Sequence, residues 1–255
     1  MLFLPIIVAF FASILTFFSG FGIGTILLPV FAIFFPLDIA IAMTGIVHFF
    51  NNFFKLFLVG KYYDKKIVLK LGITGIIGAI LGAYLLIKLS SLDLNVFFSI
   101  FQFEFNTTIL KIIIGLLLII FSVLEMYPKF KNLSFSNIAI YFIGFLSGLF
   151  GGLSGHQGAL RTAVLTKLNL EKNVFIATGV VIACMVDFTR ISIYFGSFKL
   201  FEKENILIIF LTTLSAFLGA YIGSKLLKKV TINFIQSIVS ILLITLGILI
   251  MLGII

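Results

Sequence analysis

Long runs of apolar residues constrain the fold of this 255-residue chain more than any other feature. The hydrocarbon core of a membrane is about 30 Å thick, and about 20 residues in a helix cross it. The runs are too continuous for the short alternating strands of an outer-membrane barrel. The sequence therefore predicts an all-α, polytopic membrane helical bundle. The predicted helices cover about 3–18, 25–35, 37–60, 66–89, 109–127, 136–151, 157–168, 172–198, 204–227 and 231–254.

Composition and charge exclude several other classes of protein. Hydrophobic residues make up 62% of the chain and charged residues 11%, against about 25% charged in soluble domains. The net charge of +9 comes mainly from lysines expected in membrane loops, so we expect no nucleic-acid binding. One cysteine and two histidines do not favour a metal site, and we expect no cofactor. No basic residue precedes the first apolar run, so a cleaved signal peptide is not expected.

Two glycine-rich stretches, 19–25 and 148–161, interrupt the apolar runs. Glycine permits tight turns and close approach of the backbone. Inside a membrane, a break in a helix is tolerated only where protein or a watery cavity surrounds it. The runs 25–35 and 157–168 that follow are too short to cross the membrane, so each could return as one arm of a helical hairpin. The glycines expected to provide backbone at the tips are Gly20, Gly22, Gly24, Gly152, Gly155 and Gly158.

Loop lysines distinguish hairpins from kinks in single crossing helices. The hairpin topology places eleven lysines on one side of the membrane and four on the other, whereas kinked helices divide them eight to seven. Cytoplasmic loops carry the excess of positive residues, so the count favours hairpins with both termini outside. The eleven are Lys61, Lys65, Lys66, Lys70, Lys129, Lys131, Lys167, Lys172, Lys225, Lys228 and Lys229, and the four are Lys88, Lys111, Lys199 and Lys203.

The sequence also repeats itself at an offset of 134 to 138 residues; for example, Thr-Gly at 44–45 returns at 178–179. Each half, 1–127 and 128–255, then holds one hairpin and three crossing helices. Because three is odd, the second half begins on the opposite face and is inverted, which is typical of secondary transporters. Small residues spaced by about one turn predict close helix packing. They are Gly75, Gly78, Gly82, Ser215, Gly219 and Gly223.

Four charged residues lie deep in the predicted bundle: Lys55, Arg161, Asp187 and Arg190. A charge near the bilayer centre costs at least about 2.5 kcal/mol, so each is a candidate functional residue. Pairing Arg190 with Asp187 leaves two cations without an acidic partner, and an anionic substrate would neutralise them. Lys55 and Arg190 are 135 residues apart in equivalent repeat positions, and we expect them to approach one another across the centre of the molecule.

We expect one binding chamber between two polar helix faces and the second glycine stretch. One face carries His48 and the other carries Asp187, because residues three or four apart share a helix face. These two residues are the candidates for proton or charge coupling. The residues predicted to bind substrate are Asn51, Asn52, Lys55, Ser154, His156, Gln157, Arg161 and Arg190.

Structural roles are open for several of these residues. Lys55 lies near a helix end and could extend to the lipid headgroups. Arg190 and Asp187 could form a buried structural pair. Arg161 could lie at the surface if its hairpin is shallow, and His48 could be a hydrogen-bonded packing residue. Cys184 is expected to be an inert core residue.

The residues from Gly152 to Arg161, with the looser glycine-rich stretch from Gly20 to Pro29, resemble the TauE/SafE family of membrane proteins. The resemblance covers nearly the whole chain. It implies a carrier of the bacterial plasma (inner) membrane that exports sulfite or another small sulfur oxyanion, or an organosulfonate. The His156-Gln157 pair departs from the plainer glycine run of many members.

Charge, repeat and resemblance together favour a secondary transporter, not an enzyme, that exports a small anion by alternating access. The expected partners are that anion and the lipid bilayer. One alternative is a proton-coupled transporter of another small solute or cation that uses Asp187 and His48, but the excess of deep positive charge argues against it. The other is a membrane sensor of sulfur compounds, which would normally add a soluble output domain. No paired acids or metal cluster is predicted at membrane depth, so the pattern does not favour catalysis.

Overall fold

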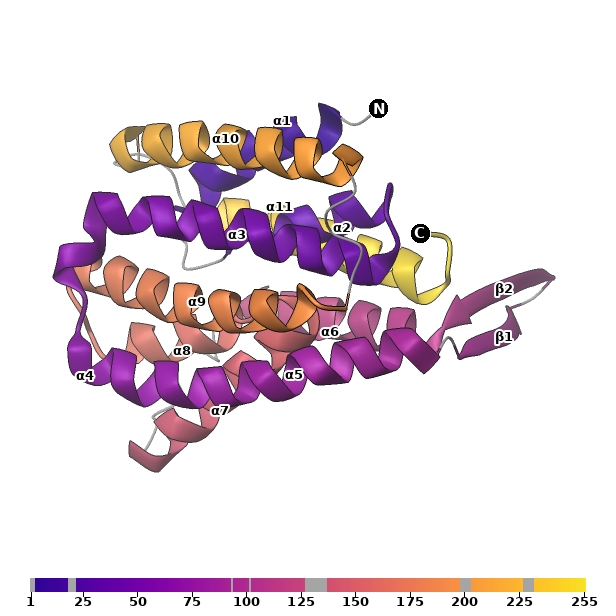
Figure 1. The fold of residues 1–255 in the computed structure, drawn as a ribbon, viewed down its shortest axis with the longest axis horizontal. Helices are drawn as coiled ribbons and strands as arrows, with labels where there is room; N and C mark the ends of the chain where they lie inside the picture. The colour runs from indigo at the N-terminus through magenta and orange to yellow at the C-terminus, as the bar shows by residue number, and fades with distance from the viewer. Residues whose placement is uncertain are drawn as a thin grey trace.

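A computed structural model describes residues 3–17, 22–92, 94–100, 102–126, 137–197, 203–226 and 232–255. Most helices run roughly along the long axis of the bundle, and a small β-hairpin projects from one end (Figure 1). The first half contains α1 (Phe3–Thr16), α2 (Ile23–Ala32), α3 (Leu37–Val59), η1 (Gly60–Tyr62), α4 (Lys65–Ile67), η2 (Val68–Gly72), α5 (Ile73–Leu92), β1 (Asn95–Ile100), β2 (Phe103–Thr108) and α6 (Ile109–Met126). The second contains α7 (Asn137–Ser154), α8 (Gly158–Lys167), α9 (Lys172–Tyr194), α10 (Lys203–Leu226) and α11 (Ile232–Met251).

Within the described residues, four helical segments are long and apolar enough to cross a membrane. Shorter apolar helices pack with them. This confirms the predicted class, a helical membrane protein, and the helix bounds follow the apolar runs closely because hydropathy is a local property of the sequence. The four segments are Leu37–Tyr62, Lys65–Leu92, Lys172–Tyr194 and Asn205–Lys225.

The second glycine stretch forms a hairpin. Helix α7 ends at Ser154, the chain turns through Gly155 with φ +83°, and α8 begins at Gly158. The Ser147 hydroxyl donates to the Gln157 carbonyl at 2.7 Å and ties the turn back to α7. Because Val164 of α8 joins the same apolar cluster as Ile140 of α7, the chain returns to the end at which α7 begins.

The first glycine stretch is described only in part. Helices α1 and α2 pack together, and α2 returns toward the end at which α1 begins (Figure 1). Gly22 caps α2 in an extended conformation, and Gly24 is helical. Gly20 lies outside the described residues.

Glycines allow the closest helix contacts in the bundle. A Cβ atom on Gly78 or Gly82 of α5 would overlap the backbone of α7, and one on Gly219 of α10 would overlap the backbone of α1. Ser215 of α10 also donates to the Ile6 carbonyl of α1 at 2.6 Å. The prediction of close packing at the spaced small residues is therefore confirmed for these pairs.

One predicted tip glycine has a different role. Gly152 lies inside α7 and not in the turn. A Cβ atom there would overlap the carbonyl of Ala79 in α5, and the Gly152 carbonyl itself accepts a hydrogen bond from the Tyr194 hydroxyl. The expectation that Gly152 provides backbone at the hairpin tip is wrong because α7 continues for two residues beyond Gly152, to Ser154, and Gly152 itself packs on α5.

The β-hairpin was not predicted. Strands β1 and β2 pair antiparallel, with Asn95 opposite Thr108 and Ile100 opposite Phe103. The apolar and polar residues alternate from Phe103 to Asn106, which is the period of a strand. This alternating pattern covers few residues and is flanked by much longer apolar runs, so it gave no prediction of strands.

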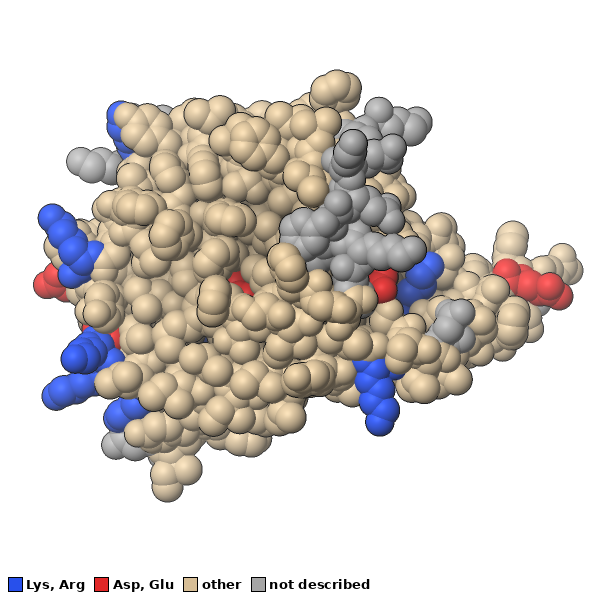
Figure 2. Space-filling view, viewed as in Figure 1, with Lys and Arg blue, Asp and Glu red and all other residues tan. Residues whose placement is uncertain are grey.

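Lysines gather at one end of the molecule (Figure 2). This lysine-rich end holds the turn between α3 and α5, where the Asp64 carboxylate accepts from the backbone of Lys66 and Ile67, and the Asp64 amide donates to the Thr178 hydroxyl. Lys88 and Lys111 lie toward the other end, beside the β-hairpin. The described lysines thus divide as the hairpin topology predicts. Those at the lysine-rich end are Lys61, Lys65, Lys66, Lys70, Lys167, Lys172 and Lys225.

The two-repeat organisation stays a prediction. The expected join near 127–132 falls wholly outside the described residues, as do Lys129, Lys131, Lys199, Lys228 and Lys229. The division into 1–127 and 128–255 is therefore not decided by the described chain. In the predicted repeat, α5 corresponds to α10 and α7 corresponds to α1. The repeat therefore relates the α5–α7 contact to the α10–α1 contact, and both contacts are extensive.

Candidate functional site

The ten polar side chains predicted at the site are all buried, none more than 5% exposed. Lys55 is 2% exposed and Arg161 is 5% exposed. The alternatives in which Lys55 extends to the headgroups and Arg161 lies at the surface are therefore wrong. The bundle covers both cations because Lys55 faces the first hairpin and α9, and Arg161 lies between α8 and α9.

The centre of the buried cluster is the Asp187 carboxylate of α9. One oxygen, Oδ2, lies 2.6 Å from Nδ1 of His48 on α3. The other, Oδ1, accepts from Nε of Arg190 at 2.9 Å and from the amide of Gln157 at 2.8 Å. A buried carboxylate requires such partners, because an unpaired charge in an apolar interior is very unfavourable. The predicted pair of Arg190 and Asp187 is confirmed, and it is part of a larger network.

Gln157 links this network to Arg161. Its amide nitrogen donates to Asp187, and its oxygen accepts from Nη1 of Arg161 at 3.0 Å. Both ends of the Gln157 amide are therefore engaged by protein. The geometry shows Gln157 holding Asp187 and Arg161 together at the hairpin tip. Its direct contact with substrate stays a prediction.

Glycines of the first hairpin fit against His48. A Cβ atom on Gly22 would overlap the His48 ring, and one on Gly24 would lie 3.5 Å from it. The Asn52 amide nitrogen lies 3.2 Å from each ring nitrogen of His48. His48 is thus held between α2, α3 and α9. A role for His48 and Asp187 in proton or charge coupling stays a prediction.

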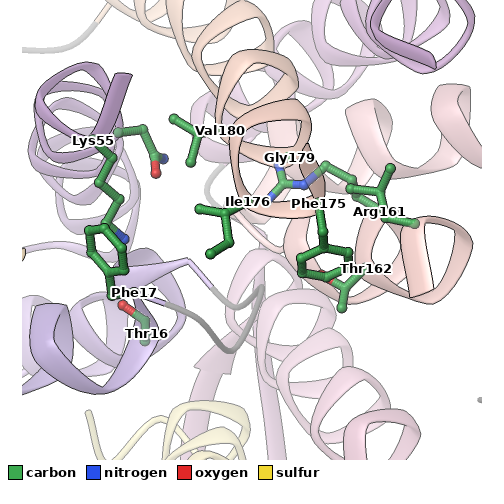
Figure 3. A pocket seen from close by; sticks show the side chains of 11 residues that line it. Thr16, Phe17, Lys55, Arg161, Thr162, Phe175, Ile176, Gly179 and Val180 are labelled. Atoms are coloured by element: carbon green, nitrogen blue, oxygen red, sulfur yellow. The ribbon is translucent and has the colours of Figure 1, made fainter. Parts of the chain in front are cut away.

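Lys55 and Arg161 line one pocket between the two halves of the chain (Figure 3). Lys55 extends from α3 on one side and Arg161 from α8 on the other, with Ile176 and Val180 of α9 between them (Figure 3). The remaining lining residues are Thr16, Phe17, Asn52, Thr162, Leu165, Phe175 and Gly179.

The pocket is positively charged. No acidic side chain lines it, and neither Lys55 nor Arg161 forms an ion pair with a described carboxylate. The Lys55 ammonium lies 5.4 Å from the centre of the Phe17 ring, a cation–π contact that stabilises the charge without neutralising it. The Thr16 hydroxyl is buried and makes no hydrogen bond to any residue that the structure describes. Two cations and a spare hydroxyl therefore face the same space.

The pocket lies close to the lysine-rich end. Lys55 is four residues before the end of α3, and Ile176 is four residues after the start of α9. At 1.5 Å per residue, both are about 6 Å from the helix ends that carry the lysine-rich loops. This end gives the shortest route between the pocket and water.

Arg190 does not share this pocket, which contradicts the expectation that it would meet Lys55. Its guanidinium lies against Gly45 of α3, where a Cβ atom would come 3.2 Å from Cζ. Gly45 and Lys55 are ten residues apart on one helix, or about 15 Å. The two cations lie on opposite sides of the contact between His48 and Asp187, because α3 and α9 run in opposite directions and each cation lies near the C-terminal end of its own helix.

Four other predicted ligands, Asn51, Ser154, His156 and Gln157, also lie outside the pocket lining. Asn51 accepts from the Ser13 hydroxyl of α1 at 3.1 Å. Ser154 lies 3.0 Å from Nδ1 of His156, and the His156 ring stacks on Phe121 of α6 with the two planes 3° apart. The chamber predicted as one unit is thus divided, and of its predicted ligands only Asn52, Lys55 and Arg161 line the pocket.

Sequence reasoning missed the pocket residues contributed by the first hairpin and α9. Thr16 and Phe17 directly precede the first glycine stretch, and this position is the one signal that could have indicated them. Ile176 and Val180 look like ordinary apolar helix residues. Cys184 on α9 is half-buried, and its inert role stays a prediction.

Fold and site define a class: a polytopic helical membrane protein with a cationic pocket between its two halves. The sequence profile of the sulfite exporter TauE/SafE family matches residues 5–250, and the chain belongs to this family. The resemblance seen in the glycine motifs is therefore confirmed over nearly the whole chain. This is a family of membrane transporters. Searches of curated proteins and of solved structures gave no match.

Proposed function

We propose that this protein is a secondary transporter that exports a small sulfur anion, with sulfite as the first candidate and an organosulfonate as the second. The observation that carries the proposal is the pocket in which Lys55 and Arg161 form no ion pair with a carboxylate of the described residues. Two buried cations without counter-ions are unfavourable in a membrane protein. An oxyanion bound between them would supply the missing charge.

The pocket chemistry suits a compact oxyanion. Arg161 offers planar, fixed donors and Lys55 offers a compact ammonium, and both form short charge-assisted hydrogen bonds to oxyanions. The Thr16 hydroxyl and the Asn52 amide add neutral hydrogen-bonding groups on the other walls. The Arg161 side chain passes α9 at Gly179, which has no side chain. A Cβ atom on Gly179 would lie 3.7 Å from Nε of Arg161. Arg161 can therefore reach the pocket beside α9.

Alternating access would follow from movement of the two halves against each other. The pocket has walls from α1 and α3 on one side and from α8 and α9 on the other. The exchange of the α5–α7 and α10–α1 contacts supports an inverted repeat, the arrangement that secondary transporters use for this motion. The lysine-rich end would be cytoplasmic, so this conformation would load its anion from inside a bacterial inner membrane.

The membrane potential would favour export. With the inside negative, each negative charge that leaves gains about 2.3 kcal/mol per 100 mV. Export of a monovalent sulfonate or hydrogen sulfite would gain this free energy for one charge, and export of divalent sulfite would gain it for two charges. Export along this gradient needs no further energy source.

Proteoliposomes loaded with radiolabelled sulfite, sulfoacetate or thiosulfate test the proposal. We expect efflux of at least one of these anions above that of empty vesicles, faster when the potential favours anion exit. Lys55→Gln and Arg161→Gln each remove a charged hydrogen-bond donor, which contributes about 1.5–3 kcal/mol. The half-saturating anion concentration should therefore rise about tenfold to a hundredfold in each variant.

Lys66→Gln is the matched control, because Lys66 is an exposed lysine at the same end of the molecule. This variant should transport like the wild type. If none of the three anions moves in well-folded wild-type protein, sulfur-anion export is wrong. If anions move equally well in Lys55→Gln and Arg161→Gln, the pocket is not the binding site.

A further inference from the structure

Arg190 and Lys55 hold equivalent places on the two sides of the α3–α9 crossing. Lys55 lies in its pocket beside Gly179 and Val180 of α9, and the Arg190 guanidinium lies beside Gly45 of α3. The repeat relates Lys55 to Arg190 at an offset of 135, and Gly45 to Gly179 at 134. The two cations therefore occupy equivalent positions in the repeat, although the nearest neighbours of Gly179 are Leu165 and Arg161 and the cations themselves are far apart along the helices.

Arg190 has hydrogen-bonding capacity that the protein does not use. It is fully buried, and Nε is bonded to Asp187. Nη2 lies 2.8 Å from the same carboxylate oxygen, and the guanidinium also contacts the Tyr194 side chain through a hydrogen bond. A guanidinium has five N–H groups, so these contacts still leave N–H groups without a partner among the described residues. An unsatisfied buried donor costs about 1–3 kcal/mol. A group of this kind in a native protein calls for a partner that another state or a ligand provides.

Two more unpartnered polar atoms stand next to the glycines that contact Arg190. Thr44 precedes Gly45, and its buried hydroxyl makes no hydrogen bond among the described residues. His156 follows Gly155, and its buried Nε2 likewise has no partner within the described chain. Both side chains are at most 3% exposed. Thr44 also packs against Gly24 of α2, so the unsatisfied groups come from α3, α9 and the second hairpin tip, with the first hairpin alongside.

The two glycines leave the Arg190 guanidinium open on the sides where side chains would otherwise cover it. A Cβ atom on Gly45 would lie 3.2 Å from Cζ, and one on Gly155 would lie 3.2 Å from Nη1. The φ of Gly155, +83°, also disfavours any other residue there. Movement of either the hairpin tip or α3 would expose the guanidinium to a ligand.

We propose that Arg190, Thr44 and His156 form a second anion site, closed in this structure, on the opposite side of the His48–Asp187 contact from Lys55. The site would take the same small oxyanion as the Lys55–Arg161 pocket and release it at the end that carries the β-hairpin. The inference rests on the proposed function. Gln157 bridges Asp187 and Arg161, so a shift of the hairpin tip would alter both sites together.

Side-resolved kinetics test the second site. Sulfite exchange is measured in proteoliposomes of uniform orientation, and the half-saturating concentration is determined separately at each membrane face. Arg190→Lys keeps the charge beside Asp187 but removes the planar donors. We expect it to raise the half-saturating concentration about tenfold at the β-hairpin end and less than twofold at the lysine-rich end. Lys55→Gln should show the reverse asymmetry.

Gly45→Ala provides a milder second variant, because it adds one methyl group beside the guanidinium and leaves the ion pair in place. It should raise the half-saturating sulfite concentration at the same membrane face as Arg190→Lys does. Gly196→Ala is its control, because a Cβ atom there meets nothing within 4 Å. If the half-saturating concentration rises equally at both faces, the protein has a single shared site. If it changes at neither face, Arg190 is purely structural. Either result overturns the second site. If the wild-type protein transports sulfite in the same assay, either result still agrees with the proposed export function.

Discussion

At the scale of single residues, the three buried cations of this protein differ in how their charge is balanced. Asp187 lies against Arg190 at 2.8–2.9 Å and reaches Arg161 only through Gln157. Lys55 has an aromatic neighbour and no acidic one within the described residues. Net positive charge is therefore concentrated at the Lys55–Arg161 pocket. Burial alone, which all three share, would not distinguish them.

Thr16 provides a test in which stability and binding change in opposite directions. Its buried hydroxyl lacks a described partner, so Thr16→Val should remove a penalty of about 1–3 kcal/mol and raise the thermal unfolding temperature. If the hydroxyl binds the anion, the same change should weaken sulfite binding about threefold to tenfold. Thermal unfolding with and without sulfite measures both effects, because a ligand stabilises the state that binds it.

Thr212 of α10 is the matched control for Thr16. Its hydroxyl is also fully buried without a partner in the described chain, but Thr212 does not line the pocket. Thr212→Val should raise the unfolding temperature and leave the shift caused by sulfite unchanged. An unaltered sulfite shift in Thr16→Val would remove Thr16 from the binding site.

At the scale of elements, the crossing of α5 and α7 sets the position of the second hairpin. Gly144, Gly148 and Gly152 of α7 all face α5 at distances that leave no room for a Cβ atom. This close contact holds α7 in place, and the hairpin tip with Gln157 and His156 follows directly after its last turn. Packing at the crossing is therefore connected to the geometry of the anion site.

Gly148→Ala tests this crossing. The added methyl group would overlap the Gly75 backbone, and overpacking of this kind destabilises by about 1–3 kcal/mol. We expect a lower thermal unfolding temperature and reduced transport. Gly196→Ala, in the open turn after α9, should change neither quantity. A Gly148→Ala protein as stable and active as the wild type would show that the two helices can separate without effect.

Most elements could be predicted from the sequence, because the local hydropathy of the chain identifies membrane helices. The hairpin turn at Gly155 could also be predicted, since α8 is too short to cross the membrane. The β-hairpin could not, because a strand gains its stability from its partner and the alternating pattern covers only a few residues. Gly152 was placed wrongly because glycine marks turns and close helix contacts alike.

At the scale of the whole molecule, the two ends differ in charge. Seven described lysines lie at the lysine-rich end, and Lys88 and Lys111 lie toward the other. The pocket lies near the lysine-rich end, and Arg190 lies beyond the central Asp187 contact. The direction of the proposed anion transport therefore depends on how the molecule is oriented in the membrane.

Cysteine labelling determines this orientation. In a Cys184→Ala background, a cysteine at exposed position Lys66 or Lys88 reports the face on which that end lies. The positive-inside rule predicts that Lys88→Cys reacts with an impermeant maleimide on intact cells, whereas Lys66→Cys reacts only after the membrane is opened. The reverse pattern would place the pocket on the outside and turn the proposed exporter into an importer.

The sequence by itself determined the membrane class, the helices, the breaks and the set of buried charges, because each depends on residues close together in the chain. Only the tertiary structure decided which charges meet. Helices α3 and α9 run in opposite directions, so equivalent residues come together only near the middle of the two helices, where His48 meets Asp187. Lys55 is seven residues beyond that point, so it faces Arg161 in one pocket while Arg190 stays on the other side.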